Sequence, residues 1–123
     1  MKKKNRVKKA QEFQTIIGNR CFESCKSMAV YVKERAEEET RIGISVSKKM
    51  GCAVERNKIK RQLRMMIHEC ILIHDDLDYI ILVRAGFKEQ SYQENKKDLE
   101  RCVKKVKIRI RLRQNEEIKN EKV

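Results

Sequence analysis

The sequence contains no proline and only four glycines among its 123 residues. Because these residues punctuate loops and turns, their scarcity gives no sign of a flexible linker or an internal repeat. A chain of this length can bury one modest hydrophobic core. We therefore predict a single domain, residues 1–113, followed by a charged and disordered tail, residues 114–123, that offers little to bury.

Long apolar runs are also missing. No run approaches the roughly 18 residues of a membrane-spanning helix, and the N-terminus lacks the apolar core of a signal peptide. We therefore expect a cytoplasmic protein without a membrane partner.

The five cysteines do not form a C-x-x-C pair. They fit neither a disulfide framework nor the usual spacing of a zinc site, so we interpret them as reduced thiols, mostly small core residues. A metal site built from Cys21, Cys25 and either His68 or His74 is an alternative with unfavourable spacing.

Negative charge is scarce relative to positive charge. The chain has 31 Lys and Arg against 18 Asp and Glu, a formal net charge of +13. Such an excess attracts polyanions, which makes nucleic acid the leading class of partner.

No motif of an independent enzyme is present. The sequence has no phosphate-binding glycine loop and no paired-histidine metal motif. Asp75, Asp76 and Asp78 are close in sequence and could bind a cation, but a solvated turn is the favoured interpretation. A nuclease that used its own metal ions would need a carboxylate cluster that we do not find.

The spacing of apolar residues predicts helices alternating with short strands. Helical periodicity covers residues 2–17, ending at Gly18, then about 54–74, and again from a cap at Ser91. Strand patterns cover residues 20–23, 28–32, 42–46 and 79–83, the last as a strand buried on both faces. From Val106 to Leu112 the period becomes strand-like directly after a helix, which leaves this segment ambiguous. The order predicts an α+β sandwich with helices covering a small sheet.

The segment of residues 48–64 is almost purely cationic. It has one acid, Glu55, and seven cations: Lys48, Lys49, Arg56, Lys58, Lys60, Arg61 and Arg64. At about 100° per residue, one helix flank beside the apolar stripe would carry Arg56, Asn57, Lys60, Arg61 and Arg64. A solvated helix face is the alternative, but the missing acids favour contact with RNA or DNA.

Two aromatic residues are candidates for stacking on unpaired bases. Phe13 lies on the apolar face of its predicted helix, where a core position is the usual interpretation. Tyr31 leaves the main apolar row of its strand, so stacking and packing are about equally favoured for it. We assign the remaining aromatics to packing or to the surface: Phe22, Tyr79, Phe87 and Tyr92.

The stretch from Arg41 to Arg64, RIGISVSKKMGCAVERNKIKRQLR, closely resembles the signature of the bacterial ribonuclease P protein family. It has a glycine-serine strand, a Lys-Lys turn and a helix that opens with an Arg-Asn-Arg-like triplet. The resemblance extends over about residues 5–106 and includes NRVKK at residues 5–9, Phe13, Tyr31, residues 78–84 and the final helix.

This resemblance implies a fold and a set of contacts. The fold would be a single-domain α-β-β-β-α-β-α sandwich with a central four-stranded sheet and a left-handed crossover. Contacts to the RNA subunit would come from Arg56, Asn57, Lys58, Lys60, Arg61 and Arg64, extended by Lys48 and Lys49. A cleft for the 5′ leader of precursor tRNA would be lined by Phe13, Ile17 and Tyr31.

The resemblance also implies a function. The chain would be the non-catalytic protein subunit of the endoribonuclease ribonuclease P, a hydrolase of tRNA processing. It would help the catalytic RNA remove the 5′ leader and would broaden substrate specificity. It would contribute no catalytic residue, bind no small-molecule substrate and hold no cofactor, because the required Mg²⁺ would be held by RNA.

Three positions depart from the family pattern. Lys58 stands in place of an arginine, Ile17 in place of a frequent aromatic, and Met65 in place of a common acid. Ile17 cannot stack as an aromatic does, so we expect a weaker grip on the leader. A general RNA-binding or ribosome-associated module is the rival interpretation, but it does not explain why Phe13, Tyr31 and the basic helix occur together.

Overall fold

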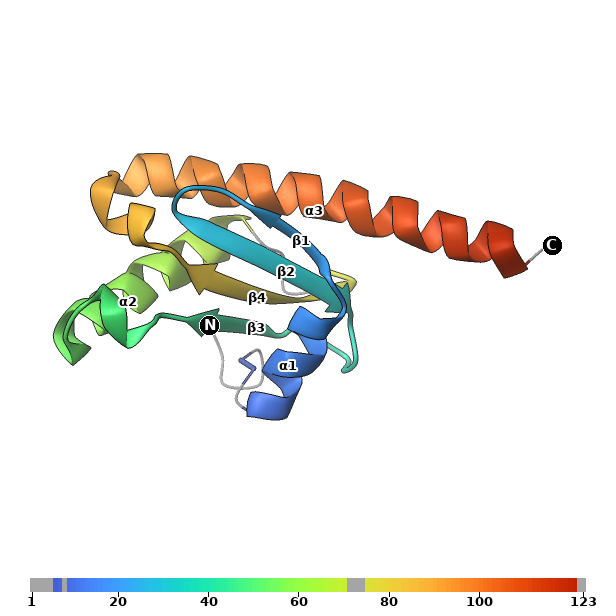
Figure 1. Cartoon of the computed structure of the whole chain (residues 1–123), viewed down its shortest axis with the longest axis horizontal. Coiled ribbons are helices and arrows are strands. Elements are labelled where there is room, and N and C mark those ends of the chain that lie inside the picture. Colours follow the sequence, from blue (N-terminus) through green and yellow to red (C-terminus); the bar gives the residue numbers. More distant parts are fainter. Residues whose placement is uncertain (1–5, 8, 71–74, 122–123) are drawn as a thin grey trace.

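A computed structural model describes residues 6–7, 9–70 and 75–121 (Figure 1). It has three α-helices, two short 3-10 helices and four strands in these ranges. In chain order they are α1 (Ala10–Gly18), β1 (Cys21–Ser24), β2 (Met28–Glu34), β3 (Ile42–Ser45), η2 (Lys48–Met50), α2 (Ala53–Cys70), β4 (Leu77–Val83), η3 (Ala85–Glu89) and α3 (Tyr92–Glu121). The predicted α+β class and the α-β-β-β-α-β-α order are confirmed.

The four strands form one mixed sheet in the order β1-β2-β4-β3. β2 pairs antiparallel with β1 and β4, whereas β3 pairs parallel with β4. Two parallel neighbours need a crossover connection, and here α2 provides it. The sheet therefore places α2 directly after β3 and the lysine turn.

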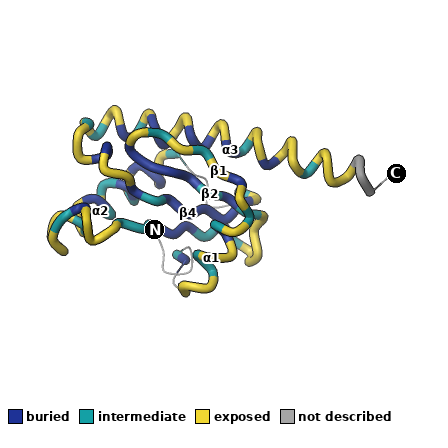
Figure 2. Tube along the Cα trace, viewed as in Figure 1, coloured by how far each residue is buried: buried dark blue, intermediate teal, exposed yellow. Residues whose placement is uncertain are grey.

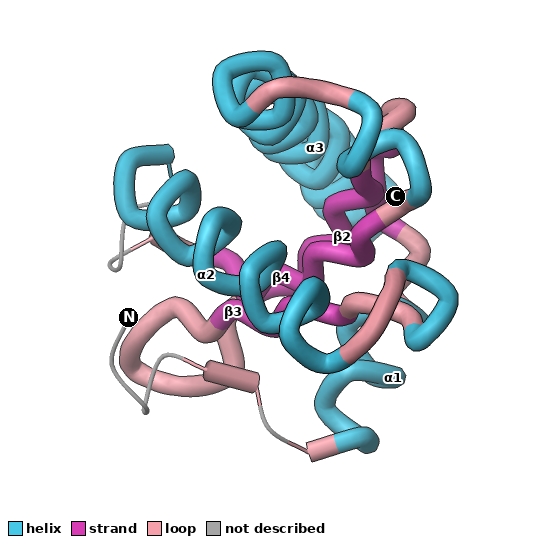
Figure 3. Tube along the Cα trace, turned by 90° about the vertical axis from the view of Figure 1, so that its left-hand side faces the viewer, coloured by secondary structure: helices cyan, strands magenta, loops and turns pink. Residues whose placement is uncertain are grey.

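The sheet is covered on both faces. α2 and α3 lie on one side of the strands and α1 lies on the other (Figure 3). Alternate residues of β2 point to each side, so Met28, Val30 and Val32 join the larger core beneath α2 and α3. β4 is almost wholly buried, as predicted, because it is a central strand with helices on both faces (Figure 2).

The first helix is shorter than predicted. It begins at Ala10, and Val7 lies before it in an extended segment. The amide of Val7 donates a hydrogen bond to the carbonyl of Ile42, and its side chain is buried. Val7 therefore reaches the core by pairing beside β3, although its spacing from Ala10 matched a helix. The helix ends at Gly18, as predicted.

The last helix is longer than predicted. Ser91 caps it as expected: its hydroxyl accepts from the Glu94 amide, and the Glu94 carboxylate accepts from the Ser91 amide. The helix then continues to Glu121, so residues 106–112, which the sequence left ambiguous, are helical. The described part of the expected disordered tail is helical, while the division of the chain at residue 113 stays a prediction. The predicted end of the central helix, residues 71–74, lies outside the described residues.

Candidate nucleic-acid interface

α2 presents the predicted row of cations next to a buried stripe. Four of its apolar side chains are buried and pack into the core under the sheet: Ile59, Leu63, Met66 and Ile67. Arg56, Lys60 and Arg64 lie half-buried beside this stripe, and Asn57 and Arg61 are exposed. Because the buried stripe fixes the rotation of the helix, these side chains share one flank. Lys58 is exposed at the edge of this surface, three residues before Arg61.

The two acids of α2 lie on its other flank. Lys88 of η3 pairs with Glu55 at 2.8 Å, and Lys96 of α3 pairs with Glu69. The hydrogen bond from Lys88 is the main cause that lowers the pKa of Glu55. Both acids are therefore turned toward η3 and α3, and the opposite flank of α2 carries cations, Asn57 and His68 but no acid. We name that flank, with Lys58, the basic flank of α2.

A tight turn holds Lys48 and Lys49 at the start of α2. Both lysines are exposed, while the next residue, Met50, is buried. The Ser47 hydroxyl accepts a hydrogen bond from the Lys49 amide at 3.2 Å, and Lys88 Nζ donates to the Met50 carbonyl at 2.9 Å. Gly51 then adopts a φ of 134°, a conformation that favours glycine. This turn extends the basic flank of α2 by two charges.

The three predicted leader-binding residues lie together on the opposite face of the sheet. Phe13 and Ile17 of α1 and Tyr31 of β2 pack around the buried Ile80 of β4. All three are half-buried, so each combines a packed side with an accessible one. Phe13 therefore packs against the core with one side of its ring and leaves part of the ring accessible. The structure brings these residues together on one face of the sheet.

Gly43 of β3 allows Phe13 to lie close to the sheet. A Cβ atom at this position would lie 2.7 Å from Cζ of Phe13 and 2.6 Å from Cδ1 of Ile80. Any side chain here would force these neighbours apart. The glycine of the family signature therefore has a packing role in this chain.

Phe22 is a member of this aromatic surface that the sequence pattern did not reveal. Its ring stacks on that of Tyr31, with centroids 4.8 Å apart and planes at 24°. The two residues are direct partners across β1 and β2, and Phe22 is 37% exposed. The register of the β1–β2 hairpin places Phe22 opposite Tyr31, and the sequence alone does not fix that register. We name the set of Phe13, Ile17, Phe22 and Tyr31 the aromatic cluster.

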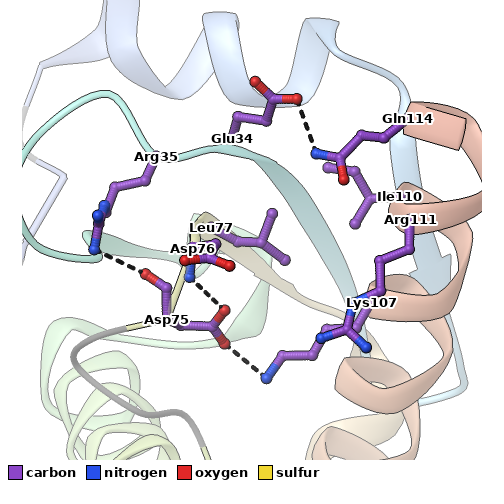
Figure 4. Close-up of a pocket in the computed structure, with 9 residues that line it drawn as sticks. All are labelled: Glu34, Arg35, Asp75, Asp76, Leu77, Lys107, Ile110, Arg111 and Gln114. Atoms are coloured by element: carbon purple, nitrogen blue, oxygen red, sulfur yellow. Dashed lines mark hydrogen bonds and ion pairs between the residues drawn. The ribbon is translucent and has the colours of Figure 1, made fainter. Parts of the chain in front are cut away.

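The acids near β4 are structural and do not form a simple solvated turn (Figure 4). Asp75 accepts a hydrogen bond from the Tyr79 hydroxyl at 2.6 Å and pairs with Lys107 at 2.7 Å. Burial alone would raise the pKa of Asp75, but these two partners outweigh it and lower the pKa. Asp78 is buried and accepts from the backbone amides of Ala36 and Arg41. The solvated-turn interpretation fits only Asp76, which is exposed.

The cysteines are free thiols with different environments. Cys21 and Cys102 are buried, Cys25 and Cys70 are half-buried, and Cys52 is exposed. Within the described ranges, no three His, Cys, Asp or Glu side chains are grouped so that they could hold a metal ion. His74, one of the candidate ligands, lies outside the described residues. No helix in the described part of the chain is long and apolar enough to cross a membrane.

Comparisons with known proteins agree with the geometry. The family model described as Ribonuclease P matches residues 1–107. The ribonuclease P protein component of Mesoplasma florum is 41% identical over 105 residues, 84% of this chain and 96% of the relative. That of Bacillus cereus strain 03BB102 is 42% identical over 104 residues, 80% of this chain and 88% of the relative.

Solved structures show the same fold. The RNase P protein of Staphylococcus aureus superposes with a TM-score of 0.73 at 33% identity, covering 85% of this chain and 97% of that one. The RNase P protein of Thermotoga maritima, at 22% identity, shares the fold with a TM-score of 0.65 over 76% of this chain and 90% of that one. The matched family model, the curated relatives and the shared fold establish that this chain belongs to the ribonuclease P protein family.

Proposed function

We propose that this chain assists a catalytic RNA subunit in removing the 5′ leader from precursor tRNA. The observation that carries the proposal is the presence of two different surfaces on one small domain. The basic flank of α2 offers charge without aromatic rings, and the aromatic cluster offers rings for unpaired bases. A protein that binds one folded RNA and one single-stranded segment needs both.

The basic flank of α2 is assigned to the RNA subunit. Arginine offers a planar fork of donors that matches phosphate oxygens, and lysine acts as a compact point charge. Arg56, Lys60 and Arg64 are half-buried, so part of each side chain is already ordered before RNA binds. This preorganisation lowers the entropic cost of binding. Lys48 and Lys49 extend the same contact.

The aromatic cluster is assigned to the leader. Stacking of a base on an aromatic ring contributes about 1–3 kcal/mol and tolerates any base, as a leader of variable sequence requires. Phe13 and Tyr31 are held by packing around Ile80, so their accessible faces keep fixed positions. The cluster therefore binds and orients the strand on the 5′ side of the cleavage site.

Hydrolysis is assigned to the RNA subunit, with Mg²⁺ that the RNA holds. This chain then supplies affinity and shape, in the cytoplasm, and contributes no catalytic group. Its cations neutralise phosphates on two RNAs that would otherwise repel each other. This neutralisation would allow the RNA subunit to cleave precursor tRNA at a lower Mg²⁺ concentration.

The test is cleavage of a 5′-labelled precursor tRNA by a bacterial ribonuclease P RNA at low Mg²⁺, with and without the chain. A reaction with the protein alone is the control. Cleavage at the mature 5′ end only when both are present is the expected result. If the protein adds nothing at any Mg²⁺ concentration, a general RNA-binding module becomes the better account, and if it cuts alone, it is a nuclease.

A further inference from the structure

The second half of α3 is as one-sided in charge as the basic flank of α2. Between residues 101 and 115 there is no acid and there are seven cations: Arg101, Lys104, Lys105, Lys107, Arg109, Arg111 and Arg113. Because the apolar residues of this segment alternate as in a strand, the sequence did not predict that its cations lie on a helix. The helix also extends away from the rest of the domain toward its C-terminal end (Figure 1).

Several of these cations have partners within the fold. Lys107 pairs with Asp75, and Arg109 pairs with Glu23 of β1. These contacts lie on the two sides of α3 that face β4 and β1. They attach the helix to the domain and offset the charge of both cations.

Three other cations are exposed, and one of them, Arg111, also lines a pocket with Asp75, Asp76 and Lys107 (Figure 4). Lys104, Lys105 and Arg111 are exposed, and none makes a hydrogen bond or ion pair with the described residues. At 100° per residue they lie away from the buried Val106 and Ile110. We name the outer face of α3 the surface formed by Lys104, Lys105, Ile108, Arg111 and Leu112.

Like charges so close on a helix repel each other. Lys105 is four residues before Arg109, and Arg111 is four residues after Lys107, but Glu23 and Asp75 offset the charges of Arg109 and Lys107. No ion pair with the described residues offsets the charge of Lys104, Lys105 or Arg111. An anionic partner would offset the charge of these cations.

We propose that the outer face of α3 is a second binding surface for the phosphate backbone of the RNA subunit. This inference rests on the proposed function and adds a contact that the basic flank of α2 does not provide. α2 and α3 lie on the same side of the sheet, and the aromatic cluster lies on the other (Figure 3). One folded RNA can therefore reach both helices, whereas the leader lies across the sheet. Arg111 and Leu112 also lie beyond residues 1–107, the part that matches the family model.

The apolar residues of this face fit RNA better than a lipid surface. Ile108 and Leu112 are both 59% exposed, but cations stand on each side of them. A helix that lies in a membrane interface needs a broad apolar face. The other apolar residues of this stretch, Val103, Val106 and Ile110, are buried against the domain.

The experiment compares two double variants that remove the same number of charges. Lys104→Ala with Arg111→Ala removes two cations of the outer face, and alanine keeps a helix. Lys9→Ala with Lys33→Ala is the control, because Lys9 precedes α1 and Lys33 lies on β2. Circular dichroism and the Tm verify the fold of both. Affinity for the RNA subunit is measured over a series of salt concentrations, with precursor tRNA and anionic vesicles as separate probes.

We expect the outer-face variant to bind the RNA subunit about tenfold more weakly, with a salt slope shallower by about 1.8 because two phosphates are no longer neutralised, while the control matches the wild type. Equal affinity of the two variants overturns the inference. So does a weakening confined to precursor tRNA or to vesicles. If the wild type itself fails to bind the RNA subunit, the proposed function falls, and this inference with it.

Discussion

Gly43 sets how closely α1 approaches the sheet, because Phe13 occupies the space that a side chain would need. In Gly43→Ala, the added methyl group must displace Phe13 or Ile80 from positions 2.6–2.7 Å away. We expect the free energy of unfolding to fall by about 1–3 kcal/mol, as in other overpacked cores. Leader affinity should fall as well, because Phe13 moves.

The matched control for this prediction is Gly18→Ala. Gly18 ends α1, and a Cβ there meets no atom within 4 Å. Its unfolding midpoint in urea should equal or slightly exceed that of the wild type. Equal midpoints for the two variants would show that the sheet has room for the methyl group.

At Ile17 a substitution is expected to raise leader affinity, in contrast to Gly43→Ala. It packs beside Phe13 and Tyr31, at a position where the family resemblance implies a frequent aromatic residue. Ile17→Phe should tighten binding of a single-stranded leader, because a new ring can stack on a base, a contact of about 1–3 kcal/mol. Fluorescence anisotropy with a short labelled RNA measures the affinity. An unchanged Kd would remove the hypothesis that Ile17 weakens the grip on the leader.

Residue identities alone could not supply the whole aromatic cluster. Family resemblance pointed to Phe13, Ile17 and Tyr31, and the structure places them together. Phe22 joins them only because β1 and β2 pair with Phe22 opposite Tyr31. A shift of one residue in that register would turn Phe22 to the other face of the sheet. Strand register depends on packing of the whole domain, which local pattern does not encode.

At the scale of elements, the end of α3 shows where pattern and structure separate. From Ile108 to Leu112, apolar residues alternate with arginines, which is the period of a strand. In the structure only Ile110 of the apolar residues there is buried, whereas Ile108 and Leu112 are exposed. A helix already capped at Ser91 gains one hydrogen bond per added residue, and the pairs of Lys107 and Arg109 hold it against the domain. The helix therefore continues through this segment despite the strand-like alternation of its residues.

Asp75 joins β4 to α3 through Tyr79 and Lys107, and its charge should stabilise the fold. Since its pKa is lowered in the folded state, the contribution is present above the ordinary carboxyl pKa and disappears as the pH falls through the lowered value. At about pH 7, Asp75→Asn should lower the free energy of unfolding by roughly 1–3 kcal/mol. The difference from the wild type should shrink as the solution is acidified.

Thermal unfolding across a pH series tests this prediction. Asp76→Asn is the control, because Asp76 is exposed and carries the same charge. It should follow the wild type at each pH. A constant difference between Asp75→Asn and the wild type down to acid pH would mean that packing, and not charge, accounts for the destabilisation.

The basic flank of α2 predicts a change in RNA binding without a change in fold. Arg56, Lys60 and Arg64 replaced together by alanine should weaken assembly with the RNA subunit and reduce the salt slope by about 0.9 for each phosphate that is no longer neutralised. The helix should persist, because the anchors Ile59, Leu63 and Met66 remain buried. Alanine at Lys9, Lys26 and Lys33 removes equal charge elsewhere and serves as the control. Assembly at wild-type affinity would refute the assigned flank.

For the whole molecule, the sheet separates the two surfaces that we propose bind different RNAs. Cations on α2, and by our inference on α3, lie on one side, and the aromatic cluster lies on the other. Under the proposed function, a chain of 123 residues would contact two RNAs at once from opposite faces of one sheet. Its net charge of +13 would also offset the mutual repulsion of those RNAs.

This arrangement predicts how the Mg²⁺ requirement should depend on salt. Mg²⁺ and the protein both neutralise phosphates, so the chain should lower the Mg²⁺ concentration for half-maximal cleavage by the RNA subunit. Because this electrostatic contribution weakens as salt rises, the shift should be large at low salt and should fade at high salt. The measurement is a Mg²⁺ titration of precursor cleavage, with and without the chain, at several salt concentrations. Saturating protein at each salt is the control, because it separates a fall in occupancy from a weaker effect of the bound protein. A shift that persists undiminished at high salt would mean that shape and stacking by the aromatic cluster, and not charge, carry the assistance.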